Sequence, residues 1–424
     1  MPVFNCISFL RIAFLSTFEK HGGAGLAAYR LRLALQKHFS AEIICFSQFE
    51  GDFRKFTLKN IPALARIGFD KYFLKKQLRK RSDLYKFETG RLGLPLHKNP
   101  DIVSSDIIHL HWIQQGFLSL EEILKLSRIK PVIWTLHDMW PFTGGCCYSN
   151  ECTRYMDSCG SCPYLKNPDA NDLSSEIWKK KERIYQGGKI TLVGPSQWIC
   201  RKAAESSLGR MADIRHIPYA IDTDLFTPVE RERVRLQTGI REDEFVLLFG
   251  AQNLDDERKG FRILEEALIL VKQSGFSMER MRLFVFGATS RNDNFHSLPV
   301  RVNYAGTIKS PEELKKLYQV SDWYVHAALA DNLPNTVIES VACGTPVMGF
   351  DSGGILEIIT DGFNGMIAKH MTAEDLAQMI LRSFDARGLL SELRKNARHF
   401  ALENYSMEKI SKAYADLYRE VSDQ

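Results

Sequence analysis

The sequence predicts an α/β protein built from two doubly wound parallel sheets, one in each half of the chain. Short apolar runs alternate with helical patterns along the whole sequence, as they do in such folds. The chain has 424 residues, more than one ordinary core accommodates, so we expect two domains of roughly 200 residues each. A composition of 45% hydrophobic and 25% charged residues is typical of a globular protein.

Five apolar runs in the first half are bounded by turn residues, as buried parallel strands are. They are RIAFLST (11–17), AEIICFS (41–47), DIIHLHW (106–112), PVIWTLHD (131–138) and ITLVGPS (190–196). The N-terminal segment lacks a basic leader and a cleavage site, so it predicts a first strand at Arg11–Ser16 and no signal peptide. No apolar run approaches the ~20 residues that a membrane span requires.

The second half repeats this pattern of strands. Its apolar runs are EFVLLFGA (244–251), RLFVFGA (282–288), VNYAGTI (302–308), DWYVHAAL (322–329) and TPVMGFD (345–351), with helical patterns at 260–275 and 310–321. A turn-rich segment places the boundary near Phe226, which gives domains at 1–226 and 227–404. We expect a C-terminal helix over about 405–424 to pack back on the first domain. Sheets of this kind bind ligands at the carboxyl ends of their strands.

The net charge and the cysteine content limit which partners the protein could bind and in which cellular compartment it could work. A net charge of +5 gives no case for nucleic-acid binding. The stretch from Arg54 to Lys98 mixes cations with aromatic residues, so it is either a surface for an anionic membrane or a solvated helical face packed on its own domain. Nine cysteines, an odd number without an export signal, favour a reducing compartment, and we expect a cytoplasmic protein.

More than half of the cysteines lie close together between residues 146 and 162. Cys159 and Cys162 have the spacing of a metal-binding pair, and Cys146 and Cys152 would complete a tetrahedron, with Cys147 as a spare. We therefore expect a structural zinc site. Free thiols or a disulfide are the alternative.

Two loops are candidates for binding a phosphate. Gly22 and Gly23 follow the first strand and open a helix, so the backbone there can approach a ligand closely. They fit a dinucleotide fingerprint only superficially, because they come late after Ser16 and the second strand ends without an acid for the ribose. Arg258 and Lys259 precede a helix, where cations oppose the helix dipole unless an anion such as a diphosphate binds. Otherwise they are ordinary exposed charges.

Histidines end two strands of the first half. His137 and Asp138 end one strand, and His109 and His111 end another. A histidine at a strand end is more often structural than catalytic. Two such sites that converge in one domain favour a functional role, because the ends of parallel strands share one edge of the sheet.

Two acids flank the start of a helix in ADNLPNTVIESVACGTP (330–346). Pro334 suits the first turn, and Asn332 or Asn335 can cap it, which puts Asp331 in the loop and Glu339 inside the helix. The N-terminus of that helix suits a phosphate. From spacing alone the acids are either a working pair or two solvated side chains.

Seven motifs, in order, resemble those of the family-4 retaining glycosyltransferases. They are HGGAG, WTLHDMWPFTGGCCY, VGPSQW, IPYAIDTDLF, ERKGF, DNLPNTVIESVACGTPVMGFDSGGILEII and DGFNG. The resemblance spans nearly the whole chain, and the region around HDMWPFTGG is similar to colanic-acid and other surface-polysaccharide transferases. It implies the GT-B architecture, with two Rossmann-like domains facing across a cleft, the acceptor in the first and the nucleotide sugar mainly in the second.

The resemblance also implies roles for single residues. Asp331 and Glu339 match the family's two acids, which contact the donor sugar and the ribose, although Asp331 replaces the usual glutamate. Lys259 matches the diphosphate lysine, whereas Asn253 stands where an arginine is usual, so Arg258 takes over part of that charge. The implied catalytic residues are His137, Asp331 and Lys259; the donor-binding residues are Gly22, Gly23, Arg258, Lys259, Asp331, Asn335, Thr336 and Glu339; and the acceptor side has His109, His111 and Asp138.

The implied activity is retaining transfer of a hexose-type sugar from a UDP- or GDP-sugar to a glycan or lipid-linked acceptor in surface polysaccharide biosynthesis. The enzyme would work at the inner face of the cell membrane. Because the basic pair Arg258 and Lys259 can replace a divalent cation, we expect no catalytic metal. Two alternatives remain. One is a sugar-nucleotide epimerase on the same architecture, and the other is a noncatalytic partner that binds a sugar nucleotide.

Overall fold

The computed structural model describes residues 10–39, 41–49, 61–229, 231–291 and 295–423. Contacts divide the chain into two compact units. Unit 1 comprises Met1–Tyr219 together with Ile410–Gln424, and unit 2 comprises Ala220–Lys409. The division falls at Tyr219, a little before the boundary expected at Phe226.

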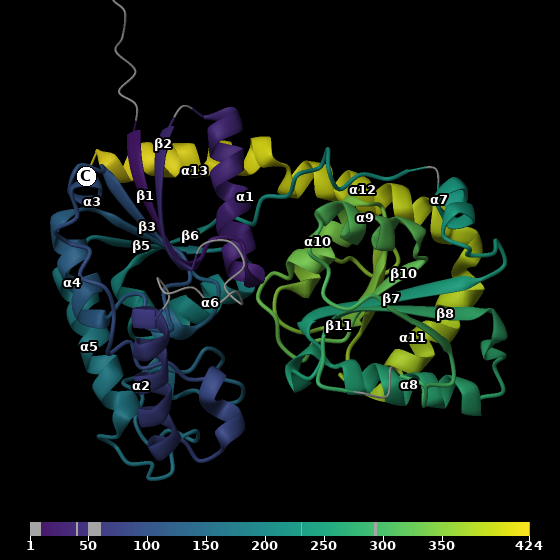
Figure 1. Ribbon diagram of the computed structural model, residues 1–424, viewed down its shortest axis with the longest axis horizontal. Coiled ribbons are helices and arrows are strands. Elements are labelled where there is room, and N and C mark those ends of the chain that lie inside the picture. The colour runs from purple at the N-terminus through teal and green to yellow at the C-terminus, as the bar shows by residue number, and fades with distance from the viewer. Residues whose placement is uncertain (1–9, 40, 50–60, 230, 292–294, 424) are drawn as a thin grey trace, which may run out of the picture. The chain divides into compact units, whose positions relative to one another are not determined.

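Unit 1 is built around a parallel sheet with the strand order β2-β1-β3-β4-β5-β6 (Figure 1). Its strands are β1 (Leu10–Phe18), β2 (Ala41–Phe49), β3 (Ile107–Leu110), β4 (Val132–Thr135), β5 (Ile190–Gly194) and β6 (Asp213–His216). Its helices are α1 (Gly22–His38), α2 (Ile61–Gln77), α3 (Pro100–Val103), α4 (Leu120–Ile129), α5 (Leu173–Gly187), α6 (Gln197–Glu205) and most of α13 (Met407–Ser422). The five strands expected in this half are therefore present, and β6 is an addition.

Unit 2 contains a second parallel sheet, ordered β12-β11-β10-β7-β8-β9. Its strands are β7 (Phe245–Asn253), β8 (Met281–Ala288), β9 (Arg301–Tyr304), β10 (Trp323–His326), β11 (Val347–Phe350) and β12 (Gly365–Ala368). Its helices are α7 (Arg231–Gln237), α8 (Phe261–Gln273), α9 (Pro311–Val320), α10 (Asn335–Ala342), α11 (Ala373–Asp385) and α12 (Leu390–Tyr405). The two sheets confirm the predicted fold class, and β12 was not foreseen.

Both sheets reverse their strand order at one point. In unit 2 the chain proceeds from β7 to β8 and β9 on one side and then returns to β10 on the other. In unit 1 the corresponding reversal lies between β1 and β3. At such a point the loops after the two central strands diverge and leave a crevice, which is where open α/β sheets bind ligands.

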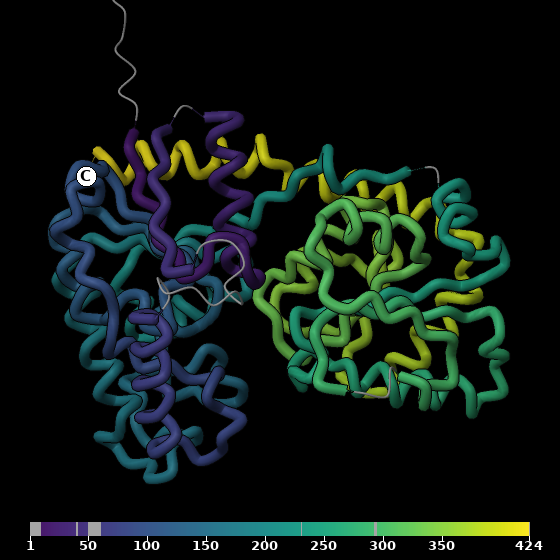
Figure 2. The backbone as a smooth tube through the Cα atoms, viewed as in Figure 1, coloured from purple at the N-terminus to yellow at the C-terminus, as the bar shows by residue number. Residues whose placement is uncertain are grey.

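The C-terminal helix α13 lies against unit 1, although the residues just before it belong to unit 2 (Figure 2). The Tyr418 hydroxyl bonds with Nδ1 of His109 on β3 at 2.8 Å, and Arg419 lies over the ring of Phe39. Tyr418 is fully buried. The last residues of the chain thus complete the core of the first unit.

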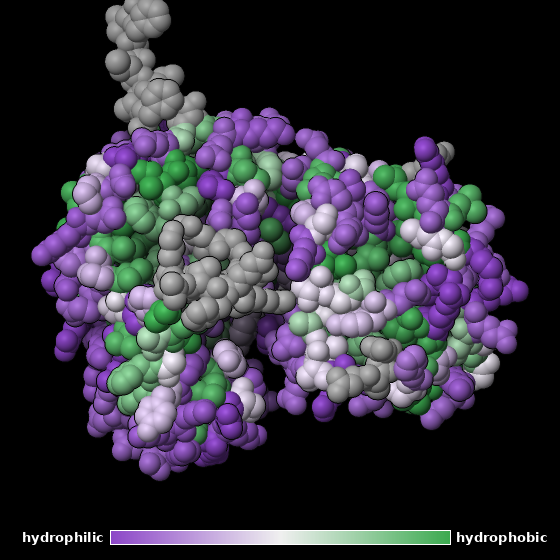
Figure 3. Space-filling view, in the orientation of Figure 1, coloured by the Kyte–Doolittle hydropathy of each residue, from purple (hydrophilic) through white to green (hydrophobic). Residues whose placement is uncertain are grey.

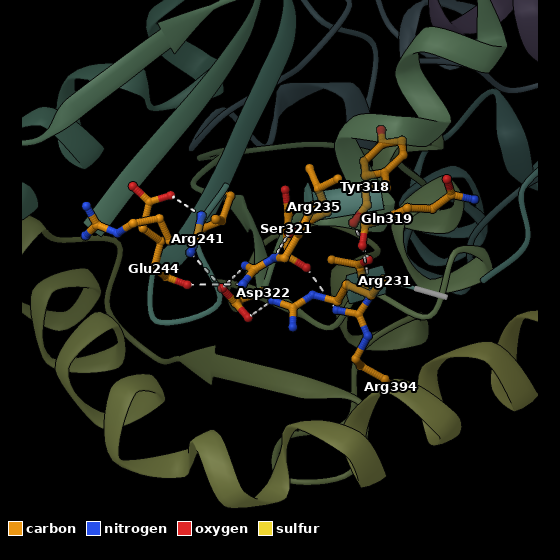
Figure 4. A network of polar contacts seen from close by, with 12 residues as sticks. Arg231, Arg235, Arg241, Glu244, Tyr318, Gln319, Ser321, Asp322 and Arg394 are labelled. Carbon is orange, nitrogen blue, oxygen red and sulfur yellow. Dashed lines mark hydrogen bonds and ion pairs between the residues drawn. The ribbon is translucent and has the colours of Figure 1, made fainter. Parts of the chain in front are cut away.

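A buried ionic network fixes the amino edge of the sheet in unit 2 (Figure 4). Asp322, which precedes β10, accepts hydrogen bonds from Arg231, from Arg235 at 2.7 Å and from the backbone N–H of Val246 at 2.7 Å. Arg394 of α12 donates to the backbone oxygen of Ser321 at 2.9 Å. The network holds β7, β10, α7 and α12 together at the edge opposite the switch point. Its role is therefore structural.

The cysteine-rich loop does not support the predicted zinc site at Cys146, Cys152, Cys159 and Cys162. Within the described ranges, no group of three or more His, Cys, Asp or Glu side chains is placed to hold a metal ion. The loop is held by ordinary hydrogen bonds instead. The Gly144 N–H donates to Sγ of Cys159 at 3.2 Å, and the Cys162 N–H donates to Asp172 at 2.7 Å. These thiols are free, as are the other cysteines in the described part of the chain.

Candidate functional site

Charged side chains converge at the switch point of unit 2. The loop after β7 carries Arg258 and Lys259 in a 3₁₀ turn (Glu257–Lys259) directly before α8, as the sequence predicts. The loop after β10 carries Asp331, and Nζ of Lys259 lies 2.5 Å from its Oδ2. Two loops that are far apart in the sequence therefore meet through an ion pair.

Arg258 strengthens the junction between these loops. Its Nη1 donates to the backbone oxygen of Ala330 at 2.7 Å and lies 3.9 Å from Oδ1 of Asp331. Its Nη2 also pairs with Asp256 at 3.2 Å. In return, the Leu329 N–H donates to the backbone oxygen of Arg258 at 2.8 Å. Both cations are thus held beside the loop that carries Asp331.

Gly260 makes this close approach possible. Its φ is +74°, in the left-handed region, and a Cβ there would lie 1.8 Å from the backbone oxygen of Ala327. Any other residue would both strain the backbone and push apart the loops after β7 and β10. Steric constraints therefore explain why the ERKGF motif has a glycine at this position.

The cations keep Asp331 ionised. Burial alone would raise the pKa of this carboxyl, but Lys259 and Arg258 outweigh burial and hold the pKa below its usual value. Asp331 is therefore a carboxylate at neutral pH, a hydrogen-bond acceptor with a cation on either side.

Glu339 lies inside α10 and is 1% exposed. It accepts a hydrogen bond from the Tyr318 hydroxyl at 2.9 Å. The expectation that Asn332 or Asn335 caps the helix is wrong, because Pro334 occupies the N-cap position and Asn335 is the first helical residue. Pro334 makes no side-chain cap hydrogen bond. Asn335 and Thr336 thus form the first turn, next to the loop of Asp331.

Three histidines of unit 1 form one group, in which His109 and His111 are buried and His137 is partly exposed. The rings of His109 and His111 stack with centroids 4.2 Å apart. Nδ1 of His111 lies 3.2 Å from Nε2 of His137, and Nδ1 of His137 bonds with the Tyr219 hydroxyl at 2.8 Å. His109 differs, because Thr135 and Tyr418 engage its two ring nitrogens. The structure therefore brings together three residues that the sequence picked out at strand ends.

Burial keeps these imidazoles neutral. It lowers the pKa of His137 and of His109 to about 3 each. His137 can therefore donate or accept a hydrogen bond at neutral pH but does not act as a cation. Asp138 is also buried and accepts from the Trp140 N–H at 2.8 Å and from Nε1 of Trp112 at 3.0 Å. These bonds order the loop in which His137 stands.

Gly22 and Gly23 lie in the first turn of α1, directly after β1 and next to the switch point of unit 1. Each unit thus has its predicted residues at the edge where ligands bind in such sheets.

Sequence reasoning missed His326, the last residue of β10. It stands at the same edge as Lys259 and Asp331. The signal that singled out His109 and His137, a histidine at the end of an apolar strand, is also present in DWYVHAAL.

Comparison with known proteins bears on these sites. Residues 230–400 match the family model of Glycosyl transferases group 1. The matched residues include the Lys259–Asp331 pair, Glu339 and His326.

Curated relatives of the chain are glycosyltransferases. The putative glycosyltransferase EpsD of Bacillus subtilis is 26% identical over 55% of this chain and 61% of its own length. The D-inositol 3-phosphate glycosyltransferase of Arthrobacter sp. is 24% identical over 75% of this chain and 71% of its own. The chain spans less than two thirds of EpsD and about half of several other curated relatives.

Solved structures resemble the chain over nearly its whole length. Sucrose-phosphate synthase of Thermosynechococcus elongatus superposes with a TM-score of 0.67 at 18% identity, covering 97% of this chain and 98% of its own. Anabaena HepE, solved in complex with UDP, gives 0.61 at 14% identity, covering 97% and 100%. The protein therefore has the GT-B fold that the sequence predicts.

Proposed function

We propose that the protein is a glycosyltransferase that takes its sugar from a nucleoside diphosphate donor. The observation that carries this proposal is the cluster of Arg258, Lys259 and Asp331 at the switch point of unit 2. A diphosphate supplies oxygens that bind the two cations. A sugar supplies hydroxyls that donate to the carboxylate.

Each residue then has a chemical task. Lys259 and Arg258 stabilise the negative charge that develops on the departing diphosphate. Asp331 accepts from hydroxyls of the transferred sugar, and Glu339, oriented by Tyr318, accepts from the ribose hydroxyls. The first turn of α10, with Asn335 and Thr336, adds backbone donors at a positive helix end.

The reaction we propose is transfer with retention. The acceptor hydroxyl attacks the anomeric carbon on the face that the diphosphate leaves, its proton passes to the departing phosphate, and the sugar–phosphate bond breaks. No enzymic nucleophile and no metal is required. Neutral His137 hydrogen-bonds the donor sugar or the acceptor, and Gly22 and Gly23 close over the phosphates. His109, His111 and Asp138 complete the acceptor side, with His109 acting through its neighbours.

The sugar we propose is a hexose, carried on UDP or GDP, and the acceptor a lipid-linked glycan of a surface polysaccharide. The protein would then work in the cytoplasm at the inner face of the membrane. Among the described helices none is long and apolar enough to cross a bilayer. Attachment to the membrane would therefore be peripheral.

Helix α2 supports peripheral attachment. Phe69 is 70% exposed and Tyr72 is 60% exposed, although both are large and apolar. Lys75 and Lys76 follow in the last turn of the helix. Figure 3 shows hydrophobic surface over α2 beside hydrophilic surface. Exposed aromatic and basic side chains on one helix suit the surface of an anionic bilayer.

The structure divides the basic stretch 54–98 into two groups of cations. Lys71 pairs with Glu88 at 2.7 Å, and Nε of Arg66 donates to the backbone oxygen of Gly116 at 2.8 Å, so both serve the fold. Lys75 and Lys76 are exposed. Residues 54–60 lie outside the described residues, so this surface is argued from α2 alone.

A donor screen tests the proposed function. UDP-, GDP- and TDP-sugars are added to the full chain, and the one that raises the melting temperature is used in a transfer assay with lipid-linked glycans. Lys259→Ala is expected to lower transfer by roughly 10²-fold or more, because it removes the positive charge that stabilises the departing diphosphate. Lys272→Ala, on an exposed residue of α8, is the matched control.

The same screen separates the alternatives. Conversion of the donor without an acceptor would indicate an epimerase, and binding without hydrolysis or transfer would indicate a noncatalytic partner. Full activity in a folded Lys259→Ala variant would contradict the diphosphate assignment.

A further inference from the structure

His326 lies at the edge of the sheet where the proposed donor site would be. Packing in the fold does not explain why a histidine occupies this position. It ends β10, one of the two central strands at the switch point, and lies five residues before Asp331 in the sequence. Side chains two apart on a strand share a face, so His326 shares the face of Tyr324. The Tyr324 hydroxyl hydrogen-bonds the side chain of Thr336, in the first turn of α10. His326 thus belongs to the layer beneath that helix end.

The imidazole is buried with one nitrogen unsatisfied. His326 is 5% exposed, and its Nε2 has no hydrogen-bond partner among the residues that the structure describes. A buried polar atom without a partner destabilises a fold, and most such atoms in native proteins are paired. A leucine at this position would avoid the cost. The unsatisfied nitrogen therefore points to a function other than packing.

Three charged groups influence the ring. Asp331, Lys259 and Arg258 all act on His326 electrostatically. Burial is the largest influence on its pKa, and together with the two cations it lowers the pKa to about 4. The ring is therefore neutral at physiological pH and carries one N–H, which Nε2 can hold.

We propose that His326 is a donor-binding residue whose neutral imidazole donates an Nε2–H hydrogen bond to a phosphate oxygen of the nucleoside diphosphate. The inference rests on the proposed function and adds a residue to that site. A phosphate oxygen only accepts, so it needs a donor, and it is drawn to this place by Lys259 and Arg258. A third cation here would repel those two, whereas a neutral donor satisfies the phosphate without that repulsion.

Three variants of the full chain test the proposal. His326→Leu removes the donor and keeps an apolar side chain, and His326→Gln offers an amide N–H in place of Nε2–H. His370→Leu changes an exposed histidine of the same unit and is the matched control. Isothermal titration calorimetry gives the Kd of UDP and GDP, and of the matching nucleotide sugar, for each chain. Melting temperatures are recorded without nucleotide.

We expect His326→Leu to weaken nucleotide binding roughly 10- to 100-fold, the effect of one hydrogen bond to a charged acceptor. The loss should be equal for the nucleotide and its sugar conjugate, and His326→Gln should restore most of it. His326→Leu should melt at or above the wild-type temperature, because the nitrogen that it removes makes no hydrogen bond. The His370→Leu control should match wild type in both measurements.

The outcomes separate this inference from the proposed function. If the wild type binds no nucleotide, the proposed function itself is contradicted. If the wild type binds and His326→Leu binds equally well, only the role of His326 fails. A loss confined to the nucleotide sugar would place the bond on the sugar and overturn the phosphate assignment. A marked fall in melting temperature would show a structural ring, and the proposal would fail.

Discussion

Lys181 is a buried cation that the sequence does not reveal. It lies on α5 with no exposed surface, and its Nζ donates to the backbone oxygens of Trp140 and Thr143. Nζ also lies 3.9 Å from the centroid of the Trp140 ring. Burial is the main cause that lowers the pKa of Lys181 to about 7. The residue braces the loop that follows His137 and Asp138.

The stability of the protein should depend on pH through Lys181. An unfolded lysine keeps its proton up to a pKa of about 10.4, whereas the folded one loses it above about 7. Between these values the unfolded chain binds more protons, so the contribution of Lys181 to the free energy of unfolding rises with pH, by at most ~1.4 kcal/mol per pH unit. Below about pH 7 both states are protonated and this slope disappears.

Urea unfolding at several values between pH 6 and pH 10 checks this, with wild type compared with Lys181→Met. The nearby thiols titrate in both chains, and because Lys181 lowers the pKa of Cys159, the difference reports Lys181 together with this coupling. We expect the slope above pH 7 to be steeper in the wild type. Parallel curves would show that Lys181 keeps its proton in the folded protein.

At the scale of single residues, the sequence indicated which side chains stand at strand ends but not what they touch. Lys259 and Asp331 were both singled out, yet their 2.5 Å pairing joins loops after different strands and depends on the strand order. His326 was missed although it shares the strand-end signal of His109 and His137, and its unsatisfied nitrogen is evident only in the structure. The cysteine spacing led to a wrong prediction of a zinc site. Spacing shows which thiolates could bind one ion, but not how the loop between them folds.

At the scale of elements, α13 contributes two tyrosines to the interior of unit 1. The Tyr418 hydroxyl bonds with Nδ1 of His109 at 2.8 Å, and the Tyr414 hydroxyl lies 3.2 Å from Oγ1 of Thr135. Oγ1 of Thr135 in turn bonds with Nε2 of His109 at 2.8 Å. The helix therefore fixes β3 and β4 at the place where their histidines stand.

Tyr418→Phe should lower the free energy of unfolding by about 1–3 kcal/mol, since it leaves the buried Nδ1 of His109 without its partner. Tyr72→Phe, on the exposed face of α2, should change it by less than ~0.5 kcal/mol. Chemical denaturation of both variants and the wild type gives the comparison. Equal stability of the two variants would show that the Tyr418–His109 bond contributes nothing.

Two edge strands, β6 and β12, were not predicted from the sequence, whereas the edge strands β2 and β9 were. Strand β6 (Asp213–His216) carries charged residues and is only partly buried, so it lacks the apolar run by which central strands were recognised. The central strands β3, β4, β10 and β11 are buried along their whole length, and each was predicted. Burial on both faces imposes the apolar run, and one open side relaxes it.

At the scale of the whole molecule, α2 should attach the protein to anionic membranes. In sedimentation with vesicles, we expect binding to phosphatidylglycerol-containing bilayers and none to phosphatidylcholine alone, because the exposed cations follow an exposed aromatic face. Lys75→Glu with Lys76→Glu should release the protein. The matched control is Lys179→Glu with Lys180→Glu, an exposed adjacent pair on α5.

Two results would contradict this. Equal indifference of the wild type to both kinds of vesicle at low salt would show that α2 does not attach the protein. Equal release by both charge-reversed pairs would show an effect of net charge and not of this helix.

The return of the chain to unit 1 has a consequence for its synthesis. Ribosomes deliver the chain from its N-terminus, and Tyr418, which bonds with His109, emerges only after the whole of unit 2. Unit 2 is complete in the sequence by Lys409, before the first unit has its final helix. Unit 1 therefore begins first and receives α13 only after unit 2 has been made. A stop codon shortly before Ile410 would disturb the core of unit 1 around His109, far earlier in the sequence.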